Sequence, residues 1–418
     1  MKRNHLLLLT SLLLQIVPVA TFADTHINGD TKNPTVIEAQ PVSHADVYIN
    51  GIYYNLYDNT KEAVVTGCDI PTPTTYWQTI NMGYITIPST VNYEGATYTV
   101  TSIKENAFAQ NDQIISITLP NSLTSIGNNA FEECKYLQSI TIPKSVTNIG
   151  QSPLSGCSGL ISITVDKDNK IYNSGNNCNA IIHTETNELI QGCQNTVIPN
   201  TVTRIGNGAF KGMSSLYSID IPNSVTSIGN EAFVECRGLS TLTIPNSVIY
   251  LGEFVFCNAE NLRSITLSES LKNIQTGTFT ACMNLESITI PASVESIEWE
   301  AFEACYRLES MYFESTTPPM VNTDMDDIAK HFFSEQFNGF AIHVPVGYKD
   351  GYMNMNNEVW KNATIIDDVV VPQTTTGITN IPSSIIKHSS PIFDLTGKRL
   401  TEAQKGINII NGKKVIIK

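Results

Sequence analysis

Apolar and polar residues alternate along this chain in short segments that return many times. In the segment at 137–143, Ile140 and Ile142 fall on one side of an extended chain, whereas Ser139 and Thr141 fall on the other. A proline follows, and because proline cannot donate to a strand ladder it ends the strand. The alternation therefore predicts a short strand with one buried and one exposed side.

The segments repeat at a fixed interval, which a column of phenylalanines and a column of prolines both mark. Within each block, neighbouring members are 23 residues apart or a multiple of 23. The phenylalanines are Phe108, Phe131, Phe210, Phe233, Phe256, Phe279 and Phe302, and the prolines are Pro120, Pro143, Pro199, Pro222, Pro245 and Pro291. Such a period is typical of a solenoid, whose repeats bury apolar residues only by stacking on their neighbours. We therefore expect a mainly β solenoid with 23-residue coils and a parallel sheet.

After each predicted strand the chain must turn and close the coil. In one copy Val146 and Ile149 point back into the core, and we expect a short helical turn over 150–157 to complete the coil. Glycine follows the isoleucine in most copies, but Gln275 and Glu298 occupy this position later in the chain. We therefore expect a negative φ at this position and a role for the glycine in packing or in a loose turn.

One coil is longer than the others. The strands that end at Val165 and Ile198 are separated by 33 residues without the Ala-Phe signature. Within this long coil, 166–198, two alternating segments at 180–183 and 188–190 flank four polar residues, which predicts a protruding β-hairpin. The first and last coils are long as well, as expected for ends that need caps.

The ends of the chain differ from the repeats. Residues 1–23 combine Lys2 and Arg3 with an apolar run of about 15 residues and a small-residue cleavage site, which predicts a signal peptide. A transmembrane anchor is the alternative, but the run is shorter than the roughly 20 residues that a span needs. The other expected divisions are a linker at 24–45, a hairpin cap with the first strand at 46–99, the repeats at 100–315, a C-terminal cap at 316–368, a linker at 369–380 and a small β segment at 381–418.

Nine cysteines would suggest disulfides in an exported protein, but their spacing favours another role. Five of them follow the phenylalanine or its substitute by three residues, and these are Cys134, Cys157, Cys236, Cys282 and Cys305. We interpret them as one buried column of free thiols. Cys178 and Cys193 lie outside this column and are the likelier pair if the chain has a disulfide. The sequence has no CxxC or HxxxH pair, so no metal site is expected.

Charge and motifs limit the functions that are open to the chain. The net charge is −14, and an acidic surface repels phosphate backbones, so we expect no nucleic-acid partner. The sequence lacks a nucleotide-binding loop, Gly-x-Ser-x-Gly and His-Glu-x-x-His. His183, His331 and His343 have no carboxylate or cysteine partner at a recognisable spacing. The sequence therefore predicts neither an enzyme nor a cofactor.

The exposed side of the predicted strands carries two columns of mainly hydroxyl side chains. One column is Ser116, Ser139, Ser162, Ser218, Thr241, Ser264, Ser287 and Ser310, and the other is Thr118, Thr141, Thr164, Asp220, Thr243, Thr266, Thr289 and Tyr312. They could meet a protein or a glycan, or could simply solvate an exposed sheet. Aromatic and arginine side chains usually carry more binding energy, so the candidate contact residues are Tyr217, Arg263, Arg307 and Tyr312.

The unit Ala-Phe-x-x-Cys-x-x-Leu-x-x-Ile-x-Ile-Pro-x-Ser-Val-x-x-Ile-Gly resembles the BspA-type leucine-rich repeat of bacterial cell-surface proteins. The resemblance extends over about 85–344, and the long coil resembles a hairpin-bearing variant of the repeat. It implies a right-handed leucine-rich-repeat solenoid with terminal caps. It also implies a non-catalytic, adhesion-type protein that binds an extracellular-matrix protein or another bacterial surface.

The tail is similar to a different family. The segments 393–399, 406–410 and 414–418 resemble the C-terminal sorting domains of the type IX secretion pathway, although the tail is shorter than such domains. This resemblance implies delivery to the outer surface of the cell.

The sequence as a whole predicts a secreted or cell-surface protein, associated with the outer membrane, that binds a protein or glycan ligand without catalysis. No transmembrane segment is expected after the signal is cleaved. A structural spacer without a specific ligand is the alternative hypothesis, and an enzyme with a site in the irregular segment 316–351 is a third.

Overall fold

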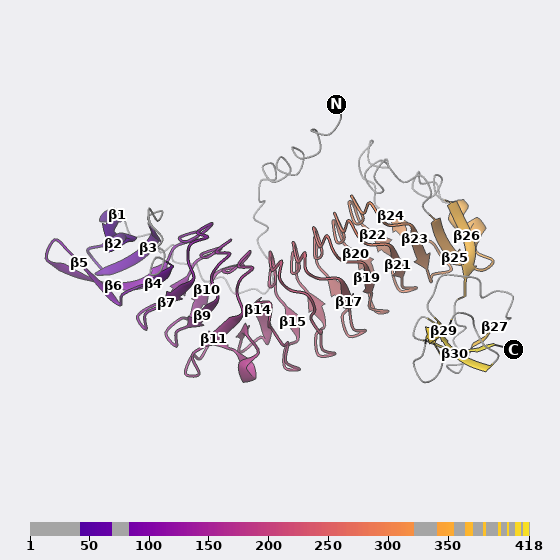
Figure 1. The fold of residues 1–418 in the computed structure, drawn as a ribbon, viewed down its shortest axis with the longest axis horizontal. Coiled ribbons are helices and arrows are strands. Elements are labelled where there is room, and N and C mark those ends of the chain that lie inside the picture. Colours follow the sequence, from indigo (N-terminus) through magenta and orange to yellow (C-terminus); the bar gives the residue numbers. More distant parts are fainter. Residues whose placement is uncertain are drawn as a thin grey trace, which may run out of the picture. The chain divides into compact units, whose positions relative to one another are not determined.

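The computed structural model describes residues 42–68, 83–321, 341–354 and 364–370, together with five short strands between 379 and 417. The predicted signal peptide and the linker up to residue 41 lie outside the described residues. Stacked coils, most of them 23 residues long, fill the repeat region and confirm the predicted mainly β solenoid (Figure 1).

The predicted strands lie on one side of the array, which we call the first face, although the segments at 196–199 and 216–221 form no strand. Partners are parallel and in register, as in Ser139↔Ser162 and Thr241↔Ser264. Isoleucines of these strands are buried, whereas the hydroxyl side chains between them point outward. The strands form three sheets, namely β4 (Tyr84–Thr86), β7 (Ser116–Thr118), β9 (Ser139–Ile142) and β11 (Ser162–Val165), then β17 (Thr241–Thr243) and β19 (Ser264–Thr266), then β21 (Ser287–Ile290), β23 (Ser310–Phe313), β25 (Ala341–Pro345) and β26 (Thr364–Val369).

A second strand in each coil, absent from the sequence prediction, forms the opposite side of the array, which we call the second face. It consists of the last two residues of the Val-x-x-Ile segment, so Ile149 indeed points into the core but also belongs to a strand. These strands are β6 (Ala96–Ile103), β8 (Ser125–Ile126) and β10 (Asn148–Ile149), then β15 (Arg204–Ile205), β16 (Ser227–Ile228) and β18 (Tyr250–Leu251), then β20 (Asn273–Ile274), β22 (Ser296–Ile297) and β24 (Met320–Val321).

The segment that carries the phenylalanine contains no helix, so the helical turn predicted over 150–157 is wrong. Two residues of each such segment, four positions apart, have left-handed backbone angles, for example Asn129 (φ 49°) and Glu133 (φ 55°). A left-handed residue at both ends of the segment interrupts a right-handed helix. They instead turn every second N–H toward the next coil.

These N–H groups build a third ladder along the array, which we call the turn ladder. Phe131 N–H donates to Pro153 O at 2.9 Å, and the N–H groups of Asn129 and Glu133 donate to the same neighbouring coil. Each step between regular coils has three such bonds of 2.6–3.0 Å. Every donor belongs to the earlier coil and every acceptor to the later one.

Phenylalanine rings stack inside the array, as the column predicts. The Phe210 and Phe233 centroids are 5.1 Å apart, and the Phe108 and Phe131 centroids are 5.2 Å apart. All seven rings of the column are buried. The stack and the surrounding leucines and isoleucines form one continuous hydrophobic core.

The cysteine column is buried beside the rings, and each of its five thiols donates a hydrogen bond to a phenylalanine carbonyl of the preceding coil. Cys134 Sγ lies 3.2 Å from Phe108 O, and Cys236 Sγ lies 3.2 Å from Phe210 O. All nine described cysteines are free thiols, Cys178 and Cys193 included, so the structure does not contain the disulfide suggested for that pair.

The glycine after the isoleucine has no left-handed φ, which confirms the packing role predicted for it. A Cβ atom on Gly127 would lie 2.4 Å from Glu105 N, and one on Gly150 would lie 2.4 Å from Asn128 N. Neighbouring coils therefore lie too close to the Cα atoms of these glycines for a side chain to fit without a shift of the backbone.

The long coil contains the predicted hairpin, formed by β13 (Ala180–His183) and β14 (Glu188–Gly192), with β12 (Tyr172–Asn173) and the 3-10 turn η2 (Gly175–Asn177) before it. β12 pairs with β13, and β14 pairs with β15 in parallel, so the hairpin joins the second face. Before the repeats, β1 (His44–Ile49) and β2 (Ile52–Tyr57) form the predicted Asn-Gly hairpin, which β3 (Glu62–Cys68) connects to β6, and β5 (Thr90–Tyr93) pairs with β6 as well.

After the repeats, α2 (Lys349–Met353) packs on β25 and β26. The tail has its own sheet of five strands, β27 (Thr379–Ile381), β28 (Ile392–Phe393), β29 (Arg399–Leu400), β30 (Gly406–Ile410) and β31 (Lys413–Ile417). β27 begins inside the stretch predicted as a linker and pairs with β31, so the tail sheet starts at Thr379. Within the described ranges, no helix has the length and apolar character that a membrane span needs.

Candidate functional site

The first face is the candidate binding surface, because it presents side chains from successive coils in straight columns. Thr118, Thr141, Thr164, Thr243 and Thr266 are exposed on it. Their registers are fixed by the strand pairs beneath them, as in Thr141↔Thr164 and Thr243↔Thr266. A ligand that lies along the face would therefore meet a polar group at most coils, and an exposed valine, Val197, at the long coil.

Two of the four predicted contact residues belong to one column of this face. Tyr217 and Arg263 both follow the buried leucine that begins their segment, and they are separated by two coils with Ser240 between them. Arg263 N–H donates to Ser240 O at 2.9 Å, which holds the column in line. The Tyr217 side chain is 72% exposed, the largest exposure among the described aromatic residues.

The other two predicted residues lie in a later coil and differ from each other. Arg307 is exposed on the turn that precedes β23. Tyr312, in β23, is half-buried because its ring stacks on His343 of β25 with 4.3 Å between centroids. The structure therefore distributes the four residues over three coils and does not gather them into one cluster.

His343 has a carboxylate partner that sequence reasoning missed. Its Nδ1 lies 2.8 Å from Asp368 Oδ1 and 3.0 Å from Asp368 Oδ2, and the histidine is 8% exposed. Asp368 follows His343 by 25 residues, because the two sit on the adjacent strands β25 and β26. A search for partners about one coil away, rather than a few residues away, would have found this pair.

The second face has exposed apolar residues that sequence reasoning also missed. Ile249 and Tyr250 are 63% and 46% exposed, at positions where earlier coils carry Thr226 and Ser227. Ile249 N–H donates to Thr226 O, so these residues continue the columns of that face. The signal was visible in the sequence as two adjacent apolar residues in columns that are polar in the other 23-residue coils.

The cysteines of the later repeats are poor candidates for reactive thiols, because burial keeps them protonated. Burial raises the pKa of Cys305 to about 12. Burial, followed by the charges of Glu235 and Glu231, raises the pKa of Cys257 to about 12 as well. Protonated thiols are poor nucleophiles and poor metal ligands. Across residues 42–68, 83–321, 341–354 and 364–370, no three His, Cys, Asp or Glu side chains come together in a way that could hold a metal ion.

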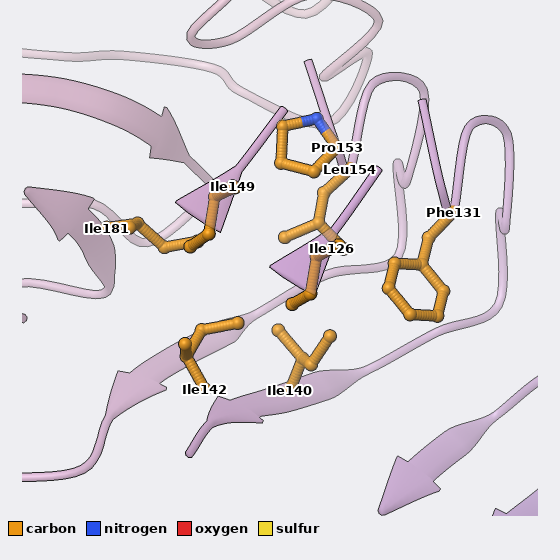
Figure 2. Close-up of a pocket in the computed structure, with 8 residues that line it drawn as sticks. All are labelled: Ile126, Phe131, Ile140, Ile142, Ile149, Pro153, Leu154 and Ile181. Atoms are coloured by element: carbon orange, nitrogen blue, oxygen red, sulfur yellow. The ribbon is translucent and has the colours of Figure 1, made fainter. Parts of the chain in front are cut away.

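An apolar gap in the core lies where Leu154 takes the place of a phenylalanine (Figure 2). Its lining consists of Ile126, Phe131, Ile140, Ile142, Ile149, Pro153, Leu154 and Ile181. The gap has no room for a water molecule, and it exposes no polar atom. It is therefore a packing defect rather than a ligand pocket.

Solved structures of several bacterial repeat proteins are similar to this chain. A leucine rich cell surface protein from Faecalibacterium prausnitzii is 20% identical, with 65% of this chain and 89% of that chain covered at a TM-score of 0.35. A leucine-rich repeat protein from Eubacterium ventriosum is 19% identical, with 65% and 83% covered at a TM-score of 0.42. The pneumococcal vaccine antigen PcpA is 16% identical, with 78% and 98% covered at a TM-score of 0.42.

No functionally curated protein matches the chain. The family model described as the BspA type leucine rich repeat region matches residues 74–191 and 187–309, in six copies. These residues are more than half of the 418, and they contain the phenylalanine, cysteine and proline columns. On this match, the chain belongs to the BspA-type leucine-rich repeat proteins.

Proposed function

We propose that this chain is an exported, non-catalytic repeat protein whose first face binds a macromolecular partner at the cell surface or outside the cell. The observation that carries the proposal is that Tyr217 and Arg263, both exposed, occupy the same position in two coils of the first face. Tyrosine and arginine provide large contact areas and several interaction types, so they dominate the energy of many protein interfaces.

The partner we favour is a protein or glycan of another cell surface, such as an extracellular-matrix protein or a bacterial surface polymer. The repeat family supports this choice, since BspA-type repeats resemble those of surface adhesins. The exposed hydroxyl columns suit a ligand that runs along several coils, because each coil adds a similar weak contact.

A direct binding experiment tests the proposal. The chain from residue 24 onward would be immobilised and probed with purified matrix proteins and with bacterial glycans. We expect Tyr217→Ala and Arg263→Ala each to weaken binding by roughly tenfold, about 1.4 kcal/mol. The matched controls are Tyr250→Ala and Arg204→Ala, which remove the same residue types from the second face.

Equal losses from both faces would argue against the first face as the binding surface. Absence of any ligand, for a folded protein, would favour the alternative of a spacer without a specific partner.

Export by the tail is a separate part of the proposal. The tail has its own sheet, β27 to β31, and resembles a type IX sorting domain. Deleting 379–418 should leave the melting temperature of the array nearly unchanged while the protein accumulates in the periplasm. Normal surface delivery of the truncated chain would refute the sorting role, and a large loss of thermal stability would assign the tail a structural role instead.

A further inference from the structure

Both sheets of the array end at the step into the long coil. On the second face β10 is the last strand of its sheet, and the next sheet starts with β12. On the first face β11 is the last strand of its sheet, and the next described strand of that face is β17. Parallel strand ladders, which connect the coils elsewhere, therefore do not cross this step among the described residues.

The ring stack is interrupted at the same step. Phe131 stacks on Phe108, and the next stack begins with Phe210 on Phe233. Leu154 occupies the position between the two stacks, next to the apolar gap (Figure 2). Dispersion contacts between large rings, which help to couple regular coils, are thus reduced here.

The turn ladder is reduced as well. Gly156 N–H donates to Lys211 O at 2.9 Å, which keeps one of the usual three main-chain bonds. Leu154 N–H donates instead to the side chain of Gln191, whose Oε1 is 3.3 Å away. The Nε2 of Gln191 donates to Ala209 O at 3.0 Å, so this fully buried amide replaces a peptide group of the ladder.

Two further main-chain bonds cross the step, from Asp166 N–H to Ile142 O at 2.9 Å and from Gln194 N–H to Leu160 O at 3.4 Å, and side chains add others. Asn169 Nδ2 donates to two carbonyls of the preceding coil, each at 2.9 Å. Tyr172 Oη accepts from Ile149 N–H at 3.0 Å, and Ser174 Oγ accepts from Val165 N–H at 2.8 Å.

The other breaks in the sheets are not comparable. β18 does not pair with β20, and β19 does not pair with β21. Both breaks lie at the step between the coils of Phe256 and Phe279. The turn ladder keeps all three main-chain bonds at this step, and the two rings stack with 5.6 Å between centroids. Among the described coils, three losses coincide only at the step into the long coil. Both sheets end there, the ring stack is interrupted, and most of the turn ladder is missing.

From this coincidence we propose that the step into the long coil is a joint that divides the array into two cooperative units. The N-terminal block is 84–165, and the C-terminal block is 166–321. In a solenoid the coupling between neighbouring repeats sets how far a local unfolding event spreads. Weak coupling at one step makes the two sides open separately, so unfolding of one block stops at the joint.

Hydrogen exchange of the full chain, with a large-to-small substitution at the edge of the joint, tests this proposal. Phe210→Ala removes the first ring of the C-terminal block. We expect exchange protection to fall roughly a hundredfold or more at 231–258, on the C-terminal side. At 129–148, on the N-terminal side, where the main-chain bonds that the amides donate stay inside the N-terminal block, protection should change by no more than about twofold.

The matched control is Phe233→Ala, which removes a ring that stacks on Phe210 and Phe256, at steps where β15, β16 and β18 pair and the turn ladder is complete. Its effect should spread equally toward Phe210 and Phe256. Should Phe210→Ala unfold the C-terminal block entirely, retained protection at 129–148 is still the expected result. Equal loss of protection on the two sides of Phe210 would overturn the proposal.

A milder variant tests whether side chains hold the joint together. Tyr172→Phe combined with Ser174→Ala removes the acceptors of the Ile149 and Val165 N–H groups with little change in volume. We expect these two amides to exchange at least about tenfold faster. Thr124→Val, which removes a hydroxyl at a step held by main-chain bonds, should leave them unchanged. Unchanged exchange at both amides in the double variant would show that the side chains do not hold the joint.

Discussion

The steps between regular coils and the step into the long coil perform the same task with different groups. A regular step is held by main-chain bonds and a ring stack, as between Phe210 and Phe233. The step into the long coil depends on the side chains of Asn169, Tyr172, Ser174 and Gln191. Main-chain bonds tolerate most substitutions, because every residue except proline can make them. A step made from side chains depends on particular residues, so substitutions should separate the two kinds of step.

The largest effect is expected in a regular coil. Phe233 is fully buried between Phe210 and Phe256, with centroid distances of 5.1 and 5.7 Å. Phe233→Ala should lower the free energy of unfolding of its block by roughly 3–5 kcal/mol, since it removes a ring and leaves a cavity. Denaturant unfolding followed by hydrogen exchange measures this loss. Tyr217→Ala is the exposed control, and a loss below about 1 kcal/mol for Phe233→Ala would contradict the stacked core.

A smaller effect is expected at the long coil. Gln191→Met keeps the volume of the side chain but leaves the Leu154 N–H without its acceptor. The unpaired buried donor should cost about 1–3 kcal/mol. The control is Gln151→Met, in which the same residue type is replaced on an exposed turn. If the two variants had equal stability in denaturant unfolding, the buried amide would not be part of the joint.

The thiol column should show a still smaller effect. Cys236→Ala removes the donor to Phe210 O and should cost about 1 kcal/mol, whereas Cys236→Ser keeps a donor at this position. In the folded chain Cys134, Cys157, Cys236, Cys282 and Cys305 should resist alkylation, because they are buried, and should react once denatured. Mass mapping that found a disulfide among these five would contradict the column of free thiols.

The smallest effect concerns the pH dependence of a regular coil. Burial, together with the charge of Glu303 and a hydrogen bond to it, raises the pKa of Glu300 from 4.5 to about 7. The folded chain therefore holds more protons than the unfolded chain between these values, so stability should fall as pH rises from about 4.5 through 7. Glu300→Gln should flatten this part of the profile in denaturant titrations at a series of pH values. An unchanged slope would show that Glu300 does not titrate in this window.

The sequence predicted the parts of the fold that repeat and are apolar. The columns of Phe233 and Cys236 are buried as expected, and the alternation at Thr241 and Thr243 gives a strand with the predicted faces. These patterns are reliable because each recurs in many coils, so the need to bury the same position is visible several times in the sequence.

The second-face strands and the turn ladder could not be predicted in the same way. Strands such as Asn148–Ile149 have two residues, too few to show an alternation. The turn ladder depends on left-handed residues, and these include Glu133 and Glu300 as well as asparagine and glycine. Glutamate rarely adopts this conformation, so its presence there is imposed by the neighbouring coils rather than by local preference.

In the candidate site, too, the features that follow the repeat were predicted and those that depend on irregular coils were not. Exposure of Tyr217 and Arg263 follows from their positions beside the strand, which the period supplies. The burial of Tyr312 depends on His343 in the last repeat-like strands, where the 23-residue spacing is already lost. A repeat pattern therefore cannot predict contacts between irregular coils, such as that of Tyr312 with His343.

The turn ladder has an electrical consequence for the array. In the strands peptide groups alternate in direction, so their dipoles largely cancel. In the turn ladder every donor, from Asn106 to Ala281, points toward the C-terminal end, as the peptide groups of an α-helix share one direction. The aligned dipoles add along the stack and give it a positive pole at its C-terminal end and a negative pole at its N-terminal end. A charged ligand, or a charged residue of a cap, would therefore distinguish the two ends even where their side chains are alike.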